Sequence, residues 1–474
     1  MKYKKTKIIC TIGPSVDTEE KISNLVNEGM DAARLNFSHG TLEKHKSYIK
    51  MIRKAEEVTG KMIAIIQDLP GPKIRVGKLE NGFIVLNENA LVTITSEVIT
   101  GNKDKFSTNY DNLILDLKQD EIILLDDGLL KLKVLNVDYN NKEALCEVLS
   151  GGILKENKGI NLPHTDLKLP SLTPKDVEFL EFGLDNDVDF IAMSFVRSAD
   201  DIIYLKNLIN QKEKNIPVIA KIERPEAIKN IDSIIAVSDL IMVARGDMGV
   251  EISTEEVPIL QKMIIKKCNE KQKPVITATQ MLETMITQTT PTRAETTDIA
   301  NAILDGTDCV MLSAETSTGM HPELVVRTMK KIILKTETIL KSTFYDALFI
   351  EDSPENILYT ICNSASMIAA RVNAKAIISI THTGKTALLL SNHRPSAQII
   401  SATNDKKIVR KTKLIWGVES IMIKDIYNFP QALKEIKEIL INNNIFSKGD
   451  RIVLAASDLK QEFESANMIL VSEI

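Results

Sequence analysis

The stretch KIICTIGPSVDTEEKISNLVNEGMDAARLNF, residues 7–37, has two short apolar runs on either side of a segment with helical periodicity. Apolar runs of five or six residues suit buried strands, and a 3.6-residue period suits a helix, which Gly29 would end. The same pattern continues along the chain, so we expect strands at residues 7–12, 32–37 and 62–67 and helices at residues 19–28 and 43–58. Strands that alternate with helices predict a parallel barrel or a doubly wound sheet.

The pattern changes between about residues 70 and 170, where helical periodicity disappears and turn signals separate short alternating runs. Asp126-Asp127-Gly128, between apolar residues 122–125 and 129–135, is a hairpin signal. We therefore expect a β-rich domain inserted after the third strand, where it would leave the core of the first domain undisturbed.

The alternation resumes after Thr173-Pro174-Lys175-Asp176, a favourable helix start. Five more strands are expected, at residues 190–195, 217–222, 240–244, 274–279 and 309–313, and then an exit helix at residues 322–341. Eight strands favour a (β/α)8 TIM barrel over an open sheet. The predicted domains are the barrel (residues 1–69 and 171–341), the inserted β-rich domain (residues 70–170) and a C-terminal α/β domain (residues 342–474) with strands at 376–380 and 451–455.

The composition is that of a globular protein, with 44% apolar and 26% charged residues among 474. A net charge of −5 argues against nucleic-acid binding, which needs a basic face. No apolar stretch approaches the length of a membrane span, and the first residues do not resemble a signal peptide. The five cysteines are scattered and odd in number, which predicts reduced core thiols of a cytoplasmic protein.

Polar side chains recur at the ends of six predicted barrel strands, where chemistry gathers in this fold. They are Arg34, Asn36 and Ser38 (second strand), Asp68 (third), Lys221 and Glu223 (fifth), Arg245 and Asp247 (sixth), Thr277, Thr279 and Gln280 (seventh) and Ser313 and Glu315 (eighth). Any one alone is more often a helix cap or a rim ion pair than a catalytic group. Their convergence on one mouth predicts an active site, and two carboxylates beside a lysine and an arginine suit a divalent metal and a phosphate. Oxygen donors alone favour Mg²⁺ or Mn²⁺ over zinc.

Six blocks of sequence carry a resemblance to a known family: ARLNFSHG (33–40), IAKIE (219–223), VARGDMGVE (243–251), TATQMLE (277–283), PTRAE (291–295) and MLSAET (311–316). They match blocks of the pyruvate kinase family, in that family's order, and the chain resembles the family from about residue 6 to residue 330. The resemblance implies a phosphotransferase of the last step of glycolysis, which uses phosphoenolpyruvate and ADP and yields pyruvate and ATP. It also implies a lid function for the inserted domain and a regulatory function for the C-terminal domain.

The resemblance assigns roles to the residues at the barrel mouth. Arg34, Lys221 and Thr279 are the implied catalytic residues, and the amides of Gly246 and Asp247 complete the implied phosphoenolpyruvate site. Glu223 and Asp247 are the implied Mg²⁺ ligands. Thr279 is implicated in protonating the enolate, and we expect a water relay because a threonine hydroxyl is too weak an acid to serve alone.

The inserted domain carries NKGINLP at residues 157–163, which resembles the family's lid lysine motif. By this resemblance Lys158 and Arg75, with Asn36 and His39 from the barrel, bind the nucleotide. A closed lid would keep water from taking the phosphoryl group in place of ADP. Without the family match, Lys158 would be read as a solvated loop lysine.

A departure from the family concerns its monovalent-cation site, which resemblance places at Asn36, Ser38 and Asp68 with the backbone oxygen of Leu69. Members that require K⁺ usually carry Glu where this chain has Lys73. The Lys73 ammonium could fill the site, since a second cation beside it would be repelled, and we therefore expect no requirement for added K⁺. The alternative is a lysine that points to solvent.

A second departure concerns the effector site. THTGKTA at residues 381–387 is not a Walker A loop, because Ser379 stands where that motif has its first glycine. It resembles the family's effector phosphate loop, and the implied effector residues are Thr381, Thr383, Gly384, Lys385 and Thr386. The usual glycine-rich second half of the site is replaced by AASDLKQE at residues 455–462, which argues for a singly phosphorylated effector over fructose 1,6-bisphosphate. A plain strand-to-helix turn is the alternative.

Two other functions stay open at this point. A different phosphoenolpyruvate-using barrel would lack the inserted domain with Lys158 and Arg75, and a catalytically inactive paralogue that binds a metabolite would have lost Lys221 or an acidic metal ligand. We expect no nucleic-acid or membrane partner, and family resemblance alone predicts a homotetramer.

Overall fold

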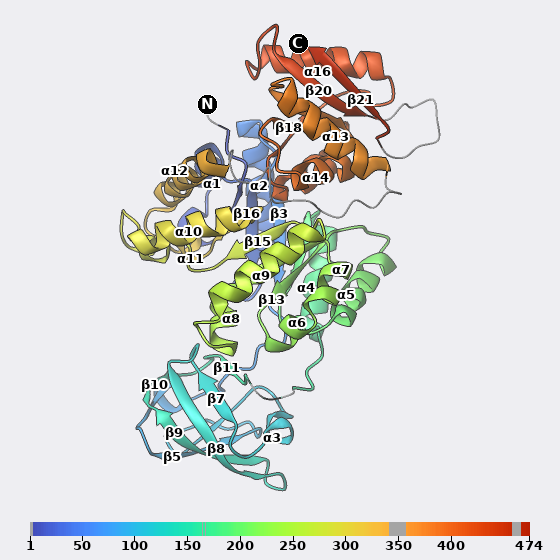
Figure 1. The fold of residues 1–474 in the computed structure, drawn as a ribbon. Helices are drawn as coiled ribbons and strands as arrows, with labels where there is room; N and C mark the ends of the chain where they lie inside the picture. The colour runs from blue at the N-terminus through green and yellow to red at the C-terminus, as the bar shows by residue number, and fades with distance from the viewer. Residues whose placement is uncertain (1–2, 164, 166, 341–356, 457–465) are drawn as a thin grey trace.

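The computed structural model describes residues 3–163, 165, 167–340, 357–456 and 466–474. The chain forms three parts in a row, with the barrel in the middle, the inserted domain at one end and the C-terminal domain at the other (Figure 1). No described helix is long and apolar enough to span a membrane.

The barrel is closed by eight parallel strands in the order β1-β2-β3-β12-β13-β14-β15-β16, with β16 pairing back onto β1. The strands are β1 (Lys7–Thr11), β2 (Ala32–Asn36), β3 (Ala64–Leu69), β12 (Phe190–Met193), β13 (Val218–Ile222), β14 (Leu240–Ala244), β15 (Val275–Ala278) and β16 (Cys309–Leu312). Its helices are η1 (Pro14–Val16), α1 (Glu19–Glu28), α2 (Leu42–Thr59), α4 (Pro174–Asp185), α5 (Ala199–Gln211), α6 (Pro225–Lys229), α7 (Ile231–Val237), α8 (Arg245–Glu251), α9 (Val257–Glu270), η3 (Glu283–Ile286), α10 (Arg293–Asp305), α11 (Ala314–Ser317) and α12 (Pro322–Leu340). The predicted (β/α)8 barrel is confirmed.

The inserted domain is built from β-strands between β3 and α4, as predicted. A six-stranded sheet has the order β11-β7-β8-β9-β5-β6, and β4 pairs with β10 in a separate ribbon. The elements are η2 (Glu80–Gly82), β4 (Phe83–Leu86), β5 (Leu91–Thr95), β6 (Lys105–Ser107), α3 (Leu113–Asp116), β7 (Ile122–Leu125), β8 (Leu130–Asp138), β9 (Glu143–Ser150), β10 (Gly152–Lys155) and β11 (Ile160–Asn161). The predicted hairpin at Asp126 and Asp127 joins β7 to β8, and both residues have the positive φ that this turn requires.

The C-terminal domain is an α/β sheet of order β19-β18-β17-β20-β21, in which only β21 runs antiparallel to its neighbour. Its elements are α13 (Ile357–Arg371), β17 (Ala376–Ile380), α14 (Lys385–Asn392), β18 (Gln398–Thr403), α15 (Lys406–Lys411), η4 (Thr412–Leu414), β19 (Val418–Met422), α16 (Phe429–Asn442), β20 (Arg451–Ala456) and β21 (Met468–Glu473). The glycine-free segment 455–462 of the effector prediction lies mostly outside the described residues, as does Lys341 at the predicted end of α12.

The C-terminal domain closes the amino-terminal end of the barrel. Leu414 is fully buried among the inward-facing side chains of the barrel strands, with Ile9, Met242 and Cys309 in the same cluster. Arg410 binds both carboxylate oxygens of Glu56, at 3.0 and 2.6 Å, on helix α2. The opposite end of the barrel, where the strands have their carboxyl-terminal ends, faces the inserted domain.

Some predicted strand boundaries were wrong. The third strand is β3 at Ala64–Leu69 instead of residues 62–67, because the Ile63 amide bonds the Glu56 side chain and precedes the ladder. Pairing continues to Asp68 on the β2 side and to Leu69 on the β12 side, which puts Asp68 inside the strand. The fourth and seventh strands stop at Met193 and Ala278, since the residues that follow turn away from extended backbone.

A helix cap fixes the point where the chain leaves the barrel. Thr173 and Asp176 form a capping box at the start of α4, where the sequence predicted a helix start. The other Asp176 oxygen accepts a 3.0 Å hydrogen bond from the amide of Gly71. One buried carboxylate therefore ties the start of the inserted domain to the helix that follows it.

Candidate active site

The carboxyl-terminal ends of the strands face the inserted domain across a cavity of about 410 Å³. Ten of the residues predicted from the sequence line it: Arg34, Asn36, Ser38, His39, Lys73, Arg75, Lys158, Lys221, Glu223 and Asp247. They come from β2, β13, the start of α8 and the loops of the inserted domain. The structure therefore brings together residues as distant in sequence as Arg34 and Asp247.

Lys221 is the buried cation at the centre of this cavity. Its side chain lies in β13 and is 7% exposed. Its ammonium forms ion pairs with Glu223 Oε1 at 2.9 Å and Asp68 Oδ1 at 3.2 Å, and donates to Ser194 Oγ at 2.6 Å. The two-residue spacing of Lys221 and Glu223 places both on the inner face of the barrel.

Arg34 reaches the same carboxylate from the opposite side. Its Nε donates to Asp68 Oδ2 at 2.6 Å, and its Nη1 donates to Thr11 Oγ1 at 3.1 Å. Asp68 thus sits between two cations and is 1% exposed. Asp68 fixes the positions of Arg34 and Lys221, so that an anionic ligand in the cavity would contact both cations.

The protonation of these groups follows from their mutual charges. Burial would raise the pKa of Asp68, but Lys221 and Arg34 together hold that pKa below its ordinary value. Burial would lower the pKa of Lys221, yet Asp68 and Glu223 raise it well above its ordinary value. Burial raises the pKa of Glu223, and the nearby Asp247 adds to the shift while Lys221 opposes it. The site therefore keeps the Lys221 cation beside two carboxylates, Glu223 and Asp247, whose mutual repulsion a further positive charge would reduce.

Glu223 and Asp247 have the character of a hard-cation site. Glu223 is 1% exposed, and its Oε2 accepts the Phe195 amide at 2.9 Å while Oε1 accepts no hydrogen bond apart from its ion pair with Lys221. Among the described residues no group of three or more His, Cys, Asp or Glu side chains could hold a metal. Two carboxylates with space beside them fit Mg²⁺, which keeps water and substrate oxygens in its shell, better than a metal needing a full protein cage.

Thr279 lies at the edge of this group and has an unusual backbone. Its φ is +68° and that of Gln280 is +55°, although neither residue is glycine. The Thr279 hydroxyl accepts the amide hydrogen of Gly246 at 2.7 Å and donates to the Ala278 carbonyl at 2.6 Å. The hydroxyl and the first turn of α8 therefore lie against each other at the mouth of the barrel.

The inserted domain contributes two cations, Lys158 and Arg75, to its own side of the cavity. Lys158 forms a 2.8 Å ion pair with Asp126, and Arg75 Nη1 donates to the Asn157 carbonyl at 2.9 Å. Asn161 bonds Glu251 of α8 at 2.7 Å across the junction with the barrel. Both cations are thus held by the domain's own loops and stand opposite Lys221.

Two of the residues predicted as a monovalent-cation site, Asn36 and Asp68, are held by partners other than Lys73. Asn36 Oδ1 accepts the Ser38 amide at 3.1 Å, and Asp68 is bound by Arg34 and Lys221. Lys73 lines the same cavity, but it reaches toward the loop that carries Lys158: a Cβ added at Gly159 would lie 3.3 Å from Lys73 Cε.

The predicted effector loop lies between β17 and α14. Thr381 Oγ1 accepts the amides of Thr383 and Gly384 at 3.3 and 2.9 Å, and Thr383 Oγ1 accepts the amide of Lys385 at 3.4 Å. Gly384 has φ +84°, a conformation that favours glycine. Three successive amides therefore gather around hydroxyls in a turn that an anion could also occupy.

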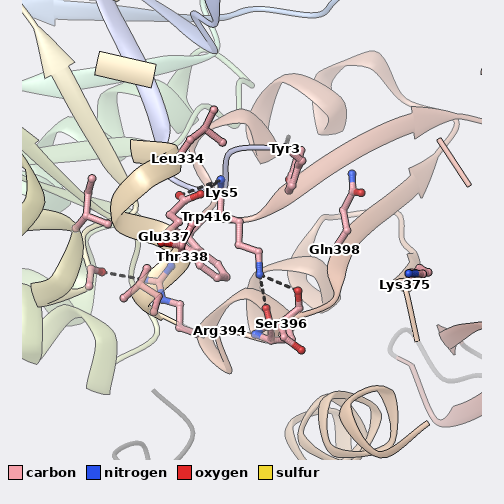
Figure 2. Close-up of a pocket in the computed structure, with 14 residues that line it drawn as sticks. Tyr3, Lys5, Leu334, Glu337, Thr338, Lys375, Arg394, Ser396, Gln398 and Trp416 are labelled. Carbon is pink, nitrogen blue, oxygen red and sulfur yellow. Dashed lines mark hydrogen bonds between the residues drawn. The ribbon is translucent and has the colours of Figure 1, made fainter. Parts of the chain in front are cut away.

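A larger cavity, of about 540 Å³, lies at the other end of the barrel, against the C-terminal domain. Figure 2 shows Lys5 and Arg394 beside Trp416 there, with Lys5 bonded to the loop at Ser396. Lys5 Nζ and Arg394 Cζ lie 4.8 and 4.7 Å from the Trp416 ring centroid. Arg394 also forms a buried 2.9 Å ion pair with Asp308 of the barrel, so this cavity belongs to the junction of two domains and not to the active site.

Sequence reasoning missed three residues that shape the active site. Ser194 accepts the shortest hydrogen bond of Lys221, Phe195 bonds Glu223 through a backbone at φ +56°, and Thr11 supports Arg34. A signal existed for Ser194, since it is a polar residue near the carboxyl-terminal end of the predicted fourth strand. Nothing in the sequence marks Phe195, since its contribution comes from its amide.

Comparisons with known proteins agree with this arrangement. A family model described as the pyruvate kinase barrel domain matches residues 3–326, and one described as the pyruvate kinase alpha/beta domain matches residues 359–472. The chain is 42% identical over 470 residues to pyruvate kinases of the Staphylococcus aureus strains MRSA252 and USA300, covering 99% of this chain and 80% of each relative. A crystal structure of a pyruvate kinase from Cryptosporidium parvum, 37% identical, superposes with a TM-score of 0.94 over 99% of this chain and 96% of that one. The chain belongs to the pyruvate kinase family, whose members are phosphotransferases.

Proposed function

We propose that this chain transfers the phosphoryl group of phosphoenolpyruvate to ADP and then protonates the resulting enolate to pyruvate. The observation that carries the proposal is Lys221, buried and charged between Asp68 and Glu223, at a mouth that also holds Arg34. A phosphoryl group in its loose transition state carries charge on its outer oxygens, so two fixed cations at its position supply most of what catalysis needs.

Glu223 and Asp247 would hold Mg²⁺ or Mn²⁺, and the ion would supply positive charge that offsets negative charge on the substrate oxygens. The amides of Gly246 and Asp247, at the first turn of α8, would receive the substrate carboxylate. In the structure the Gly246 amide is bound by the Thr279 hydroxyl instead, so substrate binding would exchange one acceptor for another.

Protonation would follow from the side of Thr279. Its hydroxyl is half-buried next to the proposed carboxylate site, and it would orient a water that delivers the proton to the enolate carbon. On the inserted domain's side of the cavity, Lys158 and Arg75, with Asn36 and His39 of the barrel, would bind the ADP phosphates. This division places one substrate on the barrel and the other against the lid.

The test is the formation of pyruvate and ATP from phosphoenolpyruvate, ADP and Mg²⁺ by the purified full-length chain. Comparable formation of both products supports the proposal. Turnover of phosphoenolpyruvate without ADP would favour a different phosphoenolpyruvate-using barrel. Binding of phosphoenolpyruvate with no turnover in any mixture would favour the inactive paralogue.

We propose that the Thr381–Thr386 turn binds the phosphate of a singly phosphorylated activator, such as a sugar monophosphate or a nucleoside monophosphate. The clustered amides and the left-handed Gly384 support one phosphate position. Titration of activity with glucose 6-phosphate, AMP and fructose 1,6-bisphosphate tests this. Strong activation by the bisphosphate with inert monophosphates would contradict it.

The proposed oligomeric state rests on the family, and the proposed cellular compartment rests on the cysteine thiols. We propose a homotetramer, to be tested by light scattering on the eluting protein. All five cysteines are free and buried, which fits a reducing compartment such as the cytoplasm.

A further inference from the structure

Two consecutive residues with left-handed backbone end strand β15. Thr279 and Gln280 have φ values of +68° and +55°. A β-branched residue such as threonine rarely adopts this region, because its Cβ substituents crowd the backbone. Such a conformation persists only where surrounding contacts fix it, and it recurs at functional sites.

The backbone of this turn is held by the side chain of Arg245. Arg245 is 8% exposed and donates from Nη2 to the Thr279 carbonyl at 2.6 Å and from Nε to the Ala278 carbonyl at 3.3 Å. The same guanidinium is anchored through Nη1 to Asp298 of α10 at 2.6 Å and to Gln261 of α9 at 3.3 Å. Arg245 thus joins the turn to two helices of the barrel wall.

The neighbour of Arg245 fixes the other side of Thr279. The Gly246 amide donates to the Thr279 hydroxyl at 2.7 Å, and a Cβ at residue 246 would lie 3.3 Å from that oxygen. Arg245 therefore holds the Thr279 backbone and Gly246 holds its side chain. Because the guanidinium is planar and presents donors at fixed angles, a lysine could replace its charge but not both carbonyl contacts.

We propose that Arg245 is a positioning residue that holds Thr279 in its left-handed conformation for proton delivery to the enolate. Arg245 does not line the catalytic cavity, and it acts only through Thr279. This inference rests on the proposed function, since it assigns a cause to the placement of a group that the proposal uses. It predicts that substitution of Arg245 slows proton transfer to the enolate more than it slows phosphoryl transfer.

The proton step can be measured on its own. In D2O, with Mg²⁺ and ATP, the enzyme should replace the methyl hydrogens of pyruvate: a C–H bond breaks as the enolate forms, its proton leaves to solvent, and a deuteron adds back to the carbon. Loss of the methyl proton signal by NMR gives this rate. Single-turnover formation of ATP from phosphoenolpyruvate and ADP gives the rate of phosphoryl transfer.

For Arg245→Lys we expect the exchange rate to fall at least about tenfold, because misplacement by a fraction of an ångström is costly for a reacting group. Single-turnover ATP formation should fall less than about threefold in the same variant. Asp298→Asn, which leaves Arg245 in place but loosens it, should show a smaller loss with the same selectivity, and it carries the test if Arg245→Lys does not fold.

The matched control is Arg394→Lys, because Arg394 is an equally buried arginine, paired with Asp308 at the opposite end of the barrel. It should lower Tm and leave the ratio of the two rates unchanged.

A second-site change separates positioning from electrostatics. Gln280 is exposed, and glycine adopts its left-handed backbone without strain. With the Gln280→Gly single variant as the reference, adding Gln280→Gly to Arg245→Lys should raise the exchange rate at least about threefold. Equal losses in both half-reactions, or no rescue by Gln280→Gly, would overturn the inference. Absence of both half-reactions in the wild-type chain would refute the proposed function instead.

Discussion

The replacement of Lys221 by methionine tests the proposed mechanism most directly. Methionine is unbranched and about as long, so it fills the volume of the lysine stem and removes only the charge and its donors. The ammonium it replaces lies 2.9 Å from Glu223 and 3.2 Å from Asp68. Arg34 still binds Asp68 at 2.6 Å, and the Phe195 amide still binds Glu223, so each carboxylate keeps at least one partner.

The expected loss follows from charge and distance. A unit charge about 4 Å from the transferring group contributes about 4 kcal/mol at an effective dielectric constant of about 20. Removal of one such stabilising group costs about 3–4 kcal/mol, or about 10²–10³ in kcat. Binding of Mn²⁺ to the free enzyme should be as strong as in the wild type or stronger, because the cation that competes for Glu223 is gone.

The assays are pyruvate formation in a coupled reaction and a Mn²⁺ titration followed by electron paramagnetic resonance. The matched control is Lys7→Met, since Lys7 is also fully buried and ion-paired, with Glu419 at 2.9 Å, but lies at the amino-terminal end of the barrel. It should lower Tm and change kcat only a few-fold. A Lys221→Met enzyme that keeps more than about a tenth of wild-type kcat would lose less than about 1.4 kcal/mol, too little for a charge at the reacting phosphoryl group.

Other changes test separate parts of the molecule. Glu223→Gln and Asp247→Asn should each weaken Mn²⁺ binding at least about tenfold, since each keeps the shape and removes a charged donor; unchanged affinity would exclude that residue as a ligand. The wild type should need no added K⁺ at constant ionic strength, and Lys73→Glu should gain a K⁺ response; a strong wild-type requirement, or no gain in the variant, would mean that Lys73 does not replace the ion. Glu419→Gln should lower Tm at pH 7, because Lys413 and Lys7 hold the pKa of Glu419 below its ordinary value, although its partial burial would raise that pKa. That stabilisation is present above the unfolded pKa of a glutamate and is lost as the pH falls toward the depressed folded value, so the two Tm curves should converge in acid; a constant difference would contradict this cause.

The barrel could be predicted because its determinants are local. Each strand is an apolar run of strand length followed by a helix-patterned segment, and burial of eight such strands admits few topologies. The pairing of Lys221 with Glu223 follows from the two-residue period of a strand, and the observed 2.9 Å contact agrees with that placement. The family itself was also predicted correctly, from six blocks of sequence in the right order.

Other features depend on contacts that no local pattern carries. The start of β3 was misplaced by two residues because Glu56, from the preceding helix, accepts the amide hydrogen of Ile63, which precedes the ladder. The insertion of Leu414 into the barrel core was not foreseen, since a single leucine in a 3-10 turn carries no sign of which domain will cover it. In both cases the deciding contact joins two separate elements of the fold.

The turn at Thr279 shows the strongest conflict between sequence and structure. Its residue types argue for extended backbone: threonine favours strands, and the preceding Val275–Ala278 is one. A sequence reading therefore extends the strand through residue 279, which would send the threonine hydroxyl along the ladder and away from Gly246. The chain leaves the strand where Arg245, itself fixed by Asp298, donates hydrogen bonds to the carbonyls of Ala278 and Thr279. Local preference and tertiary contact disagree at the residue proposed to guide the proton, which is where conflicts of this kind are expected to survive.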